Sequence, residues 1–119
     1  MSPATIATLV EESLAGPRSV YVHHVTDPAA YLEAVRSRFI ATRITPSARA
    51  VHIEQHVSFM LGLPEGDHVV YFVSEDEPQS VFFDPKTESF GCAWGPESET
   101  NRYVDLGVRS SDVLEMASA

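Results

Sequence analysis

The segment His68-Val-Val-Tyr-Phe-Val-Ser74 decides the fold, because its β-branched and aromatic residues are typical of a central strand. Ser80 to Phe83 is a second predicted strand, and Phe90 to Trp94 is predicted to return beside it as a hairpin. The turn between them is Asp84-Pro85-Lys86-Thr87, where proline presets a tight bend. Arg102 to Leu106 is the last predicted strand. These segments predict a mainly antiparallel sheet.

Two helices are predicted in the N-terminal part of the chain. Ser2-Pro3 is typical of a cap followed by proline at the first helical position, and it predicts a helix over residues 3–14. Asp27-Pro28 repeats this pattern and predicts a second helix beginning at Pro28. Both segments carry apolar side chains at helical spacing, so each helix is expected to bury one face.

Residues 18–25 alternate in a way that predicts another strand. At the other end, Ser110 or Ser111 is expected to cap a C-terminal helix that carries Val113, Leu114 and Met116. No linker or internal repeat divides the chain. We therefore expect a single α+β domain over residues 1–119, with a mainly antiparallel sheet and flanking helices.

Residues 46–61 fit two structures. Thr45-Pro46 is typical of a helix start, and Gly62-Leu63-Pro64 of a helix stop, so the end signals favour a helix. Apolar residues from Val51 to Phe59 also alternate with polar ones, which fits a strand paired through the turn Leu63-Pro64-Glu65-Gly66. The helix is the preferred prediction, and the strand remains open.

Composition and charge exclude several classes of protein. The chain has 119 residues, of which 44% are hydrophobic, and no apolar run long enough to span a membrane. The N-terminal segment lacks the pattern of a secretory signal, so we expect a cytoplasmic protein. The net charge of -9 argues against binding nucleic acid. Residues up to Gly62 balance to zero, so the whole net charge belongs to the second half.

Candidate chemical groups are few, and we expect no catalytic residue, metal or cofactor. His52 and His56 are four residues apart, which would place them on one face of a helix, but the metalloprotease pattern needs glutamate at Ile53. The more conservative interpretation is that both histidines are exposed. Cys92 is the only cysteine and lies among apolar residues, so it is expected to be buried and unreactive.

The acidic second half predicts a basic protein partner, and neither nucleic acid nor a membrane. Loops between strands usually carry recognition, and large aromatic residues often anchor it. A small ligand-binding or adaptor domain is the alternative, and a histidine-based metal protein a further one. The oligomeric state stays open. The candidate partner-binding residues are Glu75, Asp76, Glu77, Glu88, Trp94, Glu97, Glu99 and Tyr103.

A resemblance to a known family rests on the order of four motifs. They are Leu61-Gly62-Leu63-Pro64, Phe82-Phe83-Asp84-Pro85-Lys86-Thr87 leading to Phe90-Gly91, the segment Tyr103–Leu106, and the segment Ser110–Met116. This order resembles the C-terminal half of the SUKH superfamily of immunity proteins. The resemblance implies an α+β domain that acts as a bacterial immunity protein, which would bind a toxin domain and block it without catalysis.

Overall fold

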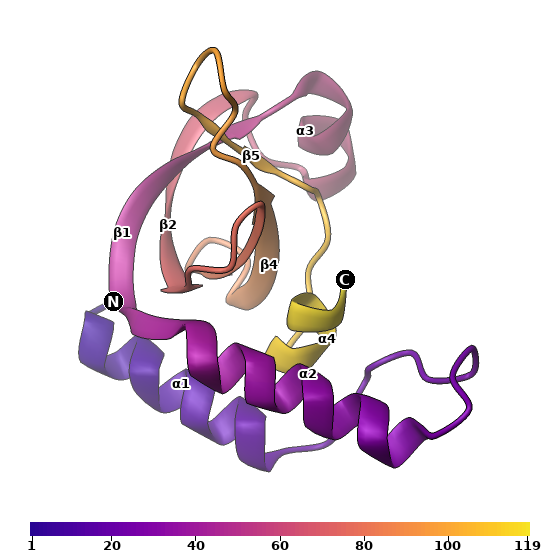
Figure 1. Cartoon of the computed structure of the whole chain (residues 1–119). Helices are drawn as coiled ribbons and strands as arrows, with labels where there is room; N and C mark the ends of the chain where they lie inside the picture. The colour runs from indigo at the N-terminus through magenta and orange to yellow at the C-terminus, as the bar shows by residue number, and fades with distance from the viewer.

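A computed structural model describes all 119 residues and shows a five-stranded barrel (Figure 1). Its strands are β1 (Arg43–Ile53), β2 (Gly66–Ser74), β3 (Gln79–Asp84), β4 (Ser89–Trp94) and β5 (Tyr103–Asp105). Successive strands pair antiparallel, and β5 closes the barrel by pairing parallel with β1. The predicted α+β class with a mainly antiparallel sheet is therefore confirmed, whereas closure into a barrel was not predicted.

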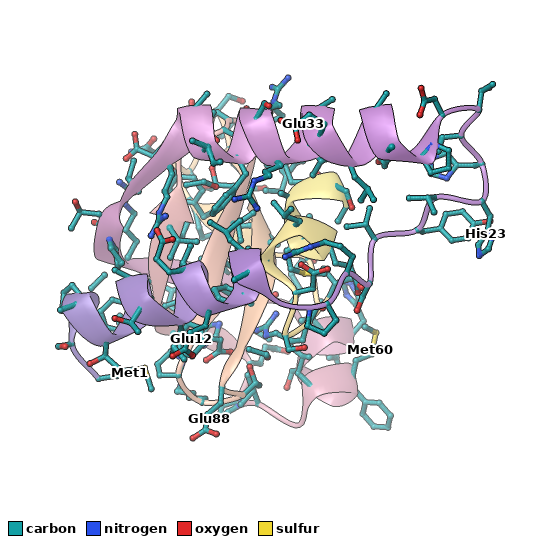
Figure 2. All side chains as sticks on the ribbon, turned by 90° about the horizontal axis from the view of Figure 1, so that it is seen from below. Met1, Glu12, His23, Glu33, Met60 and Glu88 are labelled. Atoms are coloured by element: carbon teal, nitrogen blue, oxygen red, sulfur yellow. The ribbon has the colours of Figure 1, made fainter.

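Three of the four helices cover one side of the barrel. They are α1 (Pro3–Ala15), α2 (Pro28–Thr42) and α4 (Val113–Ser118), and α4 lies between the other two (Figure 2). The fourth helix, α3 (Gln55–Leu61), stands on the opposite side, away from α1 and α2 (Figure 1). No helix combines the length and the apolar content needed to cross a membrane.

Side-chain caps begin α1, α2 and α4, with one correction to the prediction, whereas α3 has no side-chain cap. Ser2 accepts a hydrogen bond from the amide of Thr5, and Asp27 accepts one from the amide of Ala30. The cap of α4 is Asp112, which accepts from the amide of Leu114. Neither Ser110 nor Ser111 is the cap. Asp112 takes this role because its carboxylate also binds Arg18, which ties the start of α4 to the end of α1.

Alternation along the strands divides the apolar residues between two cores. One set points into the barrel and comprises Val51, Val70, Phe72, Phe82 and Ala93. The other lies between the outer barrel surface and the three covering helices, and it includes Ile6, Val10, Phe39, Val73 and Phe83. A strand buried on both faces reads as a continuous apolar run, and this is the pattern that marked β2 in the sequence.

The strand predicted at residues 18–25 does not form. This segment is a loop between α1 and α2, and it projects from the body of the protein (Figures 1 and 2). Tyr21 stacks on His24, with ring centroids 5.1 Å apart, and His24 meets Tyr31 edge-on. The prediction was wrong because alternation alone does not supply a neighbouring strand to pair with.

Residues 46–61 are divided between the two structures that the sequence suggested. The alternating part belongs to β1, which ends at Ile53, and only residues from Gln55 onward form the helix α3. The preferred helix over the whole segment is therefore wrong for its first half. The predicted stop is correct, because Gly62 caps α3 in the left-handed conformation at φ 68°.

Candidate partner-binding surface

The three side chains of the acidic triplet at residues 75–77 contact residues of three different elements. Glu75 forms an ion pair with Arg49 of β1. Asp76 accepts two hydrogen bonds from Arg38 of α2, at 2.7 and 2.8 Å, and this contact lowers the pKa of its carboxyl group. Two of the three carboxylates are therefore neutralised within the chain.

Glu77, the third member of the triplet, has no arginine partner. Its nearest polar contact is the hydroxyl of Tyr103, 3.4 Å away. Partial burial raises the pKa of Tyr103, and the negative charge of Glu77 adds to this effect. Tyr103 keeps its proton at neutral pH and can donate a hydrogen bond to the Glu77 carboxylate.

The loop between β4 and β5 folds back on itself and rests beside Pro78. The amide of Gly95 donates to the carbonyl of Pro78 at 2.8 Å, and the amide of Glu97 donates to the carbonyl of Arg102 at 2.9 Å. Gly95 has φ 139°, and a Cβ there would approach the Arg102 carbonyl to 2.9 Å. Glycine is therefore required at this turn.

These contacts gather five of the eight predicted residues on one surface, which we call the loop face: Glu77, Trp94, Glu97, Glu99 and Tyr103. The β4–β5 loop, which carries Glu97 and Glu99, lies on the side of the barrel away from α1 and α2 (Figure 1). Glu77 lies nearer to α2, since the adjacent Asp76 binds Arg38. Trp94 is 47% exposed, while Tyr103 packs its ring against Phe72 at 4.8 Å. Trp94 is thus the exposed aromatic of the loop face, and Tyr103 is mainly a packing residue.

Glu88 lies apart from the loop face. It occupies the β3–β4 turn with φ 52°, at the end of the hairpin opposite to Gly95. Strands of six residues span about 20 Å. Asp76 faces Arg38 on α2, while Glu75 is paired with Arg49, which lies beside Tyr103. Since Glu88 and Asp76 point elsewhere, the eight predicted residues do not form one surface.

The arginines of this chain contact other groups of the same chain. Six of the seven form an ion pair with a carboxylate, and Arg36 instead donates to the carbonyl of Leu14. The carboxylates left without an arginine include Glu77 and Glu99 on the loop face. Glu97 forms an ion pair with Arg102, with an N–O distance of 3.4 Å. Exposed carboxylates without a partner therefore outnumber exposed basic groups without one, of which Lys86 is an example.

A polar cluster that sequence reasoning missed fills the other end of the barrel. Arg109 donates to Asp84 at 2.9 Å and to both oxygens of Asp105, at 2.6 and 2.9 Å. His68 contacts Asp105 through Nε2 at 3.3 Å, while its Nδ1 is buried without a partner. Asp105 and Arg109 are four residues apart, but His68 and Asp84 are distant from them in the sequence. The only local signal was polar residues at positions that alternation points inward.

The electrostatics of this cluster depend on Asp105. Burial raises the pKa of its carboxyl group, but hydrogen bonds from Arg109 and His68 outweigh burial and hold the pKa at about 2. The guanidinium of Arg109 also lies over the Phe82 ring, 5.0 Å from its centroid. Arg109 lines the edge of a pocket together with Tyr21 and Tyr31, whereas the side chains of His68, Asp84 and Asp105 are buried. We interpret the cluster as structural, because its charged groups are paired with one another.

The histidine pair does not share a helix face. His52 lies on β1 with Nδ1 3.1 Å from Asp67, while His56 is exposed on α3. No group of three metal-ligating side chains occurs in the structure. Cys92 is fully buried as predicted, and its Sγ donates to the carbonyl of Met116. Burial raises the pKa of this thiol to about 12, which keeps it protonated.

Comparison with known proteins adds no relative from which a function could be transferred. No family model matches the chain, and no curated protein or solved structure matches it either.

Proposed function

We propose that this chain is a non-catalytic bacterial protein-binding domain that captures a basic protein partner through the loop face. The partner would be a toxin domain, and the chain its immunity protein, as the resemblance to the SUKH superfamily implies. The proposal places this complex in the cytoplasm. It is carried by one observation, the exposed Trp94 at the end of β4, next to the loop that carries Glu97 and Glu99.

Charge on the loop face supports a basic partner. Glu77 and Glu99 are exposed, and no arginine of the chain contacts either of them. A basic toxin that holds a negatively charged substrate would be attracted to such a surface, and complementary charge speeds encounter well beyond the neutral rate. The carboxylates would therefore steer the partner.

Trp94 supplies the apolar contact that charge alone does not. Exposed charge pairs at a rim contribute little affinity, whereas a buried aromatic anchor often contributes 2 kcal/mol or more. The backbone of Trp94 is held between β3 and β5, where it pairs with Gln79 and Val104. The anchor is therefore held by a rigid strand end rather than by a mobile loop.

The test uses the product of the gene next to this one as the partner, with the association and dissociation rates measured at low and high salt. We expect the association rate to fall several-fold as salt rises, because screening shortens the reach of exposed charges to about 8 Å. The double change Glu77→Gln and Glu99→Gln should lower the association rate. Trp94→Ala should raise the dissociation rate about 30-fold.

A matched control removes two carboxylates on the helical side, Glu12→Gln and Glu33→Gln. It makes the net charge less negative by the same amount, but it should lower the association rate less than the loop-face variant does. In cells, co-expression of the wild-type chain should restore growth stopped by the toxin, and Trp94→Ala should restore it less. Association that is independent of salt, together with no effect of Trp94→Ala, would refute the loop face as the binding surface.

A further inference from the structure

The short helix α3 carries the most exposed large apolar side chain of the protein. Phe59 is 91% exposed, and Met60 beside it is 64% exposed. The helix buries only Val57, which packs against Gly107. Isolated apolar residues are common on a protein surface, whereas contiguous ones usually mark a place where another molecule binds. α3 therefore carries more apolar surface than its packing uses.

A row of apolar side chains connects α3 with Trp94 of the loop face. Trp94 pairs with Val104 on β5, and residues directly opposite each other share a face of the sheet. Leu106 follows two residues later on the same face, is 39% exposed, and its amide still donates to a carbonyl of β4. The methyl group of Met60 would lie 3.3 Å from a Cβ at Gly107, so α3 adjoins the end of β5 (Figure 1). We call this row the apolar strip: Trp94, Val104, Leu106, Met60 and Phe59.

The charges of the segments that carry the apolar strip are mainly negative. Residues 54–67 and 92–108 contain six carboxylates but only one lysine or arginine, Arg102, which pairs with Glu97. One of the six, Asp105, is buried and bound to Arg109. The other five are Glu54, Glu65, Asp67, Glu97 and Glu99. Asp67 contacts a histidine, whereas Glu54, Glu65 and Glu99 are exposed and form no ion pair.

Basic groups of the other segments are engaged or lie away from the apolar strip. Lys86 is in the β3–β4 turn, at the end of the hairpin opposite to Trp94. The N-terminus begins α1, on the other side of the barrel from α3 (Figure 1). Arg109 donates to Asp84 and Asp105. A second copy of this chain would bring the same carboxylates together, and an anionic lipid surface would be repelled. The charges therefore favour a basic protein as the molecule that covers the strip.

We propose that the apolar strip is part of the partner-binding surface, and that the partner is a basic protein whose contact face has an apolar centre surrounded by lysine and arginine. This inference rests on the proposed function and extends its contact surface from the loop face across β5 to α3. Apolar side chains of the partner would cover Phe59 and Met60 as well as Trp94, and its basic side chains would meet Glu54 and Glu65. An apolar centre with a polar rim is the usual organisation of protein–protein interfaces.

The experiment measures binding of the product of the neighbouring gene to the double variant Phe59→Ala with Met60→Ala. The dissociation rate should rise about tenfold, because two apolar contacts are lost, while the salt dependence of association stays that of the wild type. Alanine favours helices, so α3 should persist, and circular dichroism and the Tm check this. The matched control, Tyr21→Ala with Ile40→Ala, removes exposed apolar surface from the helical side and should leave both rates unchanged. Hydrogen exchange of the wild-type complex should be slowed at residues 55–63 as well as at 94–104.

The outcomes separate this inference from the proposed function. If Trp94→Ala raises the dissociation rate and the Phe59 and Met60 double variant does not, the inference is overturned and the proposed function stands. If the wild type does not bind the neighbouring product at all, both are overturned. Sedimentation of the chain alone tests the remaining occupant, a second copy. Self-association of the wild type that the double variant loses would assign the apolar strip to a dimer and overturn the inference.

Discussion

At the scale of single residues, the most constrained group is Arg109. It enters the barrel between Asp84 and Asp105, and a Cβ at Gly91 would come within 2.7 Å of its Nη1 and of the Phe82 ring. Because Gly91 has no side chain, it leaves room for the guanidinium of Arg109 beside the Phe82 ring. A buried ion pair stabilises a fold only when its remaining hydrogen bonds are satisfied, and the amide of Gly107 supplies one of these to Asp105.

Because of this cluster, the free energy of unfolding of the protein depends on pH. Asp105 has a pKa of about 2 in the folded state, below the value of about 3.9 for an unfolded chain. Its stabilising contribution, about 2 to 3 kcal/mol, is complete above pH 5 and is lost as the pH falls toward 2. Urea unfolding measured from pH 7 to pH 2 should show this decrease.

The variant Asp105→Asn isolates the contribution of this carboxylate. It should be less stable at pH 7 by about 2 to 4 kcal/mol, because Arg109 loses part of its buried partner. Its stability should also fall less steeply below pH 5 than that of the wild type. Parallel acid profiles for the two proteins would mean that other carboxylates, such as Asp76 or Asp112, cause the acid sensitivity.

The burial of a residue could be predicted from the sequence where its sequence neighbours determine its surroundings. Cys92 was placed correctly because its neighbours are apolar and belong to a strand. The ion pairs of Glu75 and Asp76 could not be predicted, since Arg49 and Arg38 lie far away in sequence and meet them only through the barrel. The candidate site therefore shrank from eight residues to the five of the loop face.

At the scale of elements, α3 shows how two local signals can both be correct. Alternation up to Ile53 describes β1, and the glycine stop describes the end of α3, so neither pattern governs the whole segment. The helix has only seven residues, too few to be stable alone, and it depends on Val57 packing beside Gly107. Cap and turn chemistry was predictable here, whereas the boundary between strand and helix required the tertiary structure.

Gly62 is expected to be the most sensitive position of α3. Gly62→Ala should lower the free energy of unfolding by about 1 kcal/mol, because φ 68° is unfavourable for a residue with a Cβ. No atom lies within 4 Å of a Cβ built at this position, so the loss would come from the backbone alone. Thermal and urea unfolding measure it.

Gly62→Asn serves as the control for this explanation. Asparagine tolerates the left-handed conformation better than alanine, so it should recover part of the lost stability. If the two variants are equally unstable, the conformation of residue 62 is not the cause.

At the scale of the whole molecule, carboxylates outnumber basic groups, and several of them have no partner. Six of the seven arginines form ion pairs within the chain, whereas Glu77, Glu88 and Glu99 are exposed without one. A net charge of -9 destabilises a compact chain by self-repulsion, and salt screens this repulsion. Exposed ion pairs are weakened by the same screening, but each contributes little.

We therefore expect added salt to stabilise this protein. Raising sodium chloride from 20 to 300 mM should raise the Tm by roughly 4 °C, which corresponds to about 1 kcal/mol. Calorimetry at the two salt concentrations measures it. A variant with Glu12→Gln, Glu33→Gln and Glu99→Gln should respond less to salt. A Tm that falls with salt would show that the ion pairs outweigh the repulsion.

Closure of the barrel by β5 also bears on how the chain is made. Val51 pairs with Tyr103, so a strand from the middle of the chain has no neighbour on one side until residues 103–105 have been synthesised. Until then, β1 and β4 are both open edges, which are prone to pair with other chains. A ribosome-bound chain that stops before β5 would carry both edges unprotected. We therefore expect the chain to need chaperones most late in translation, shortly before residues 103–105 emerge and cover the two open edges.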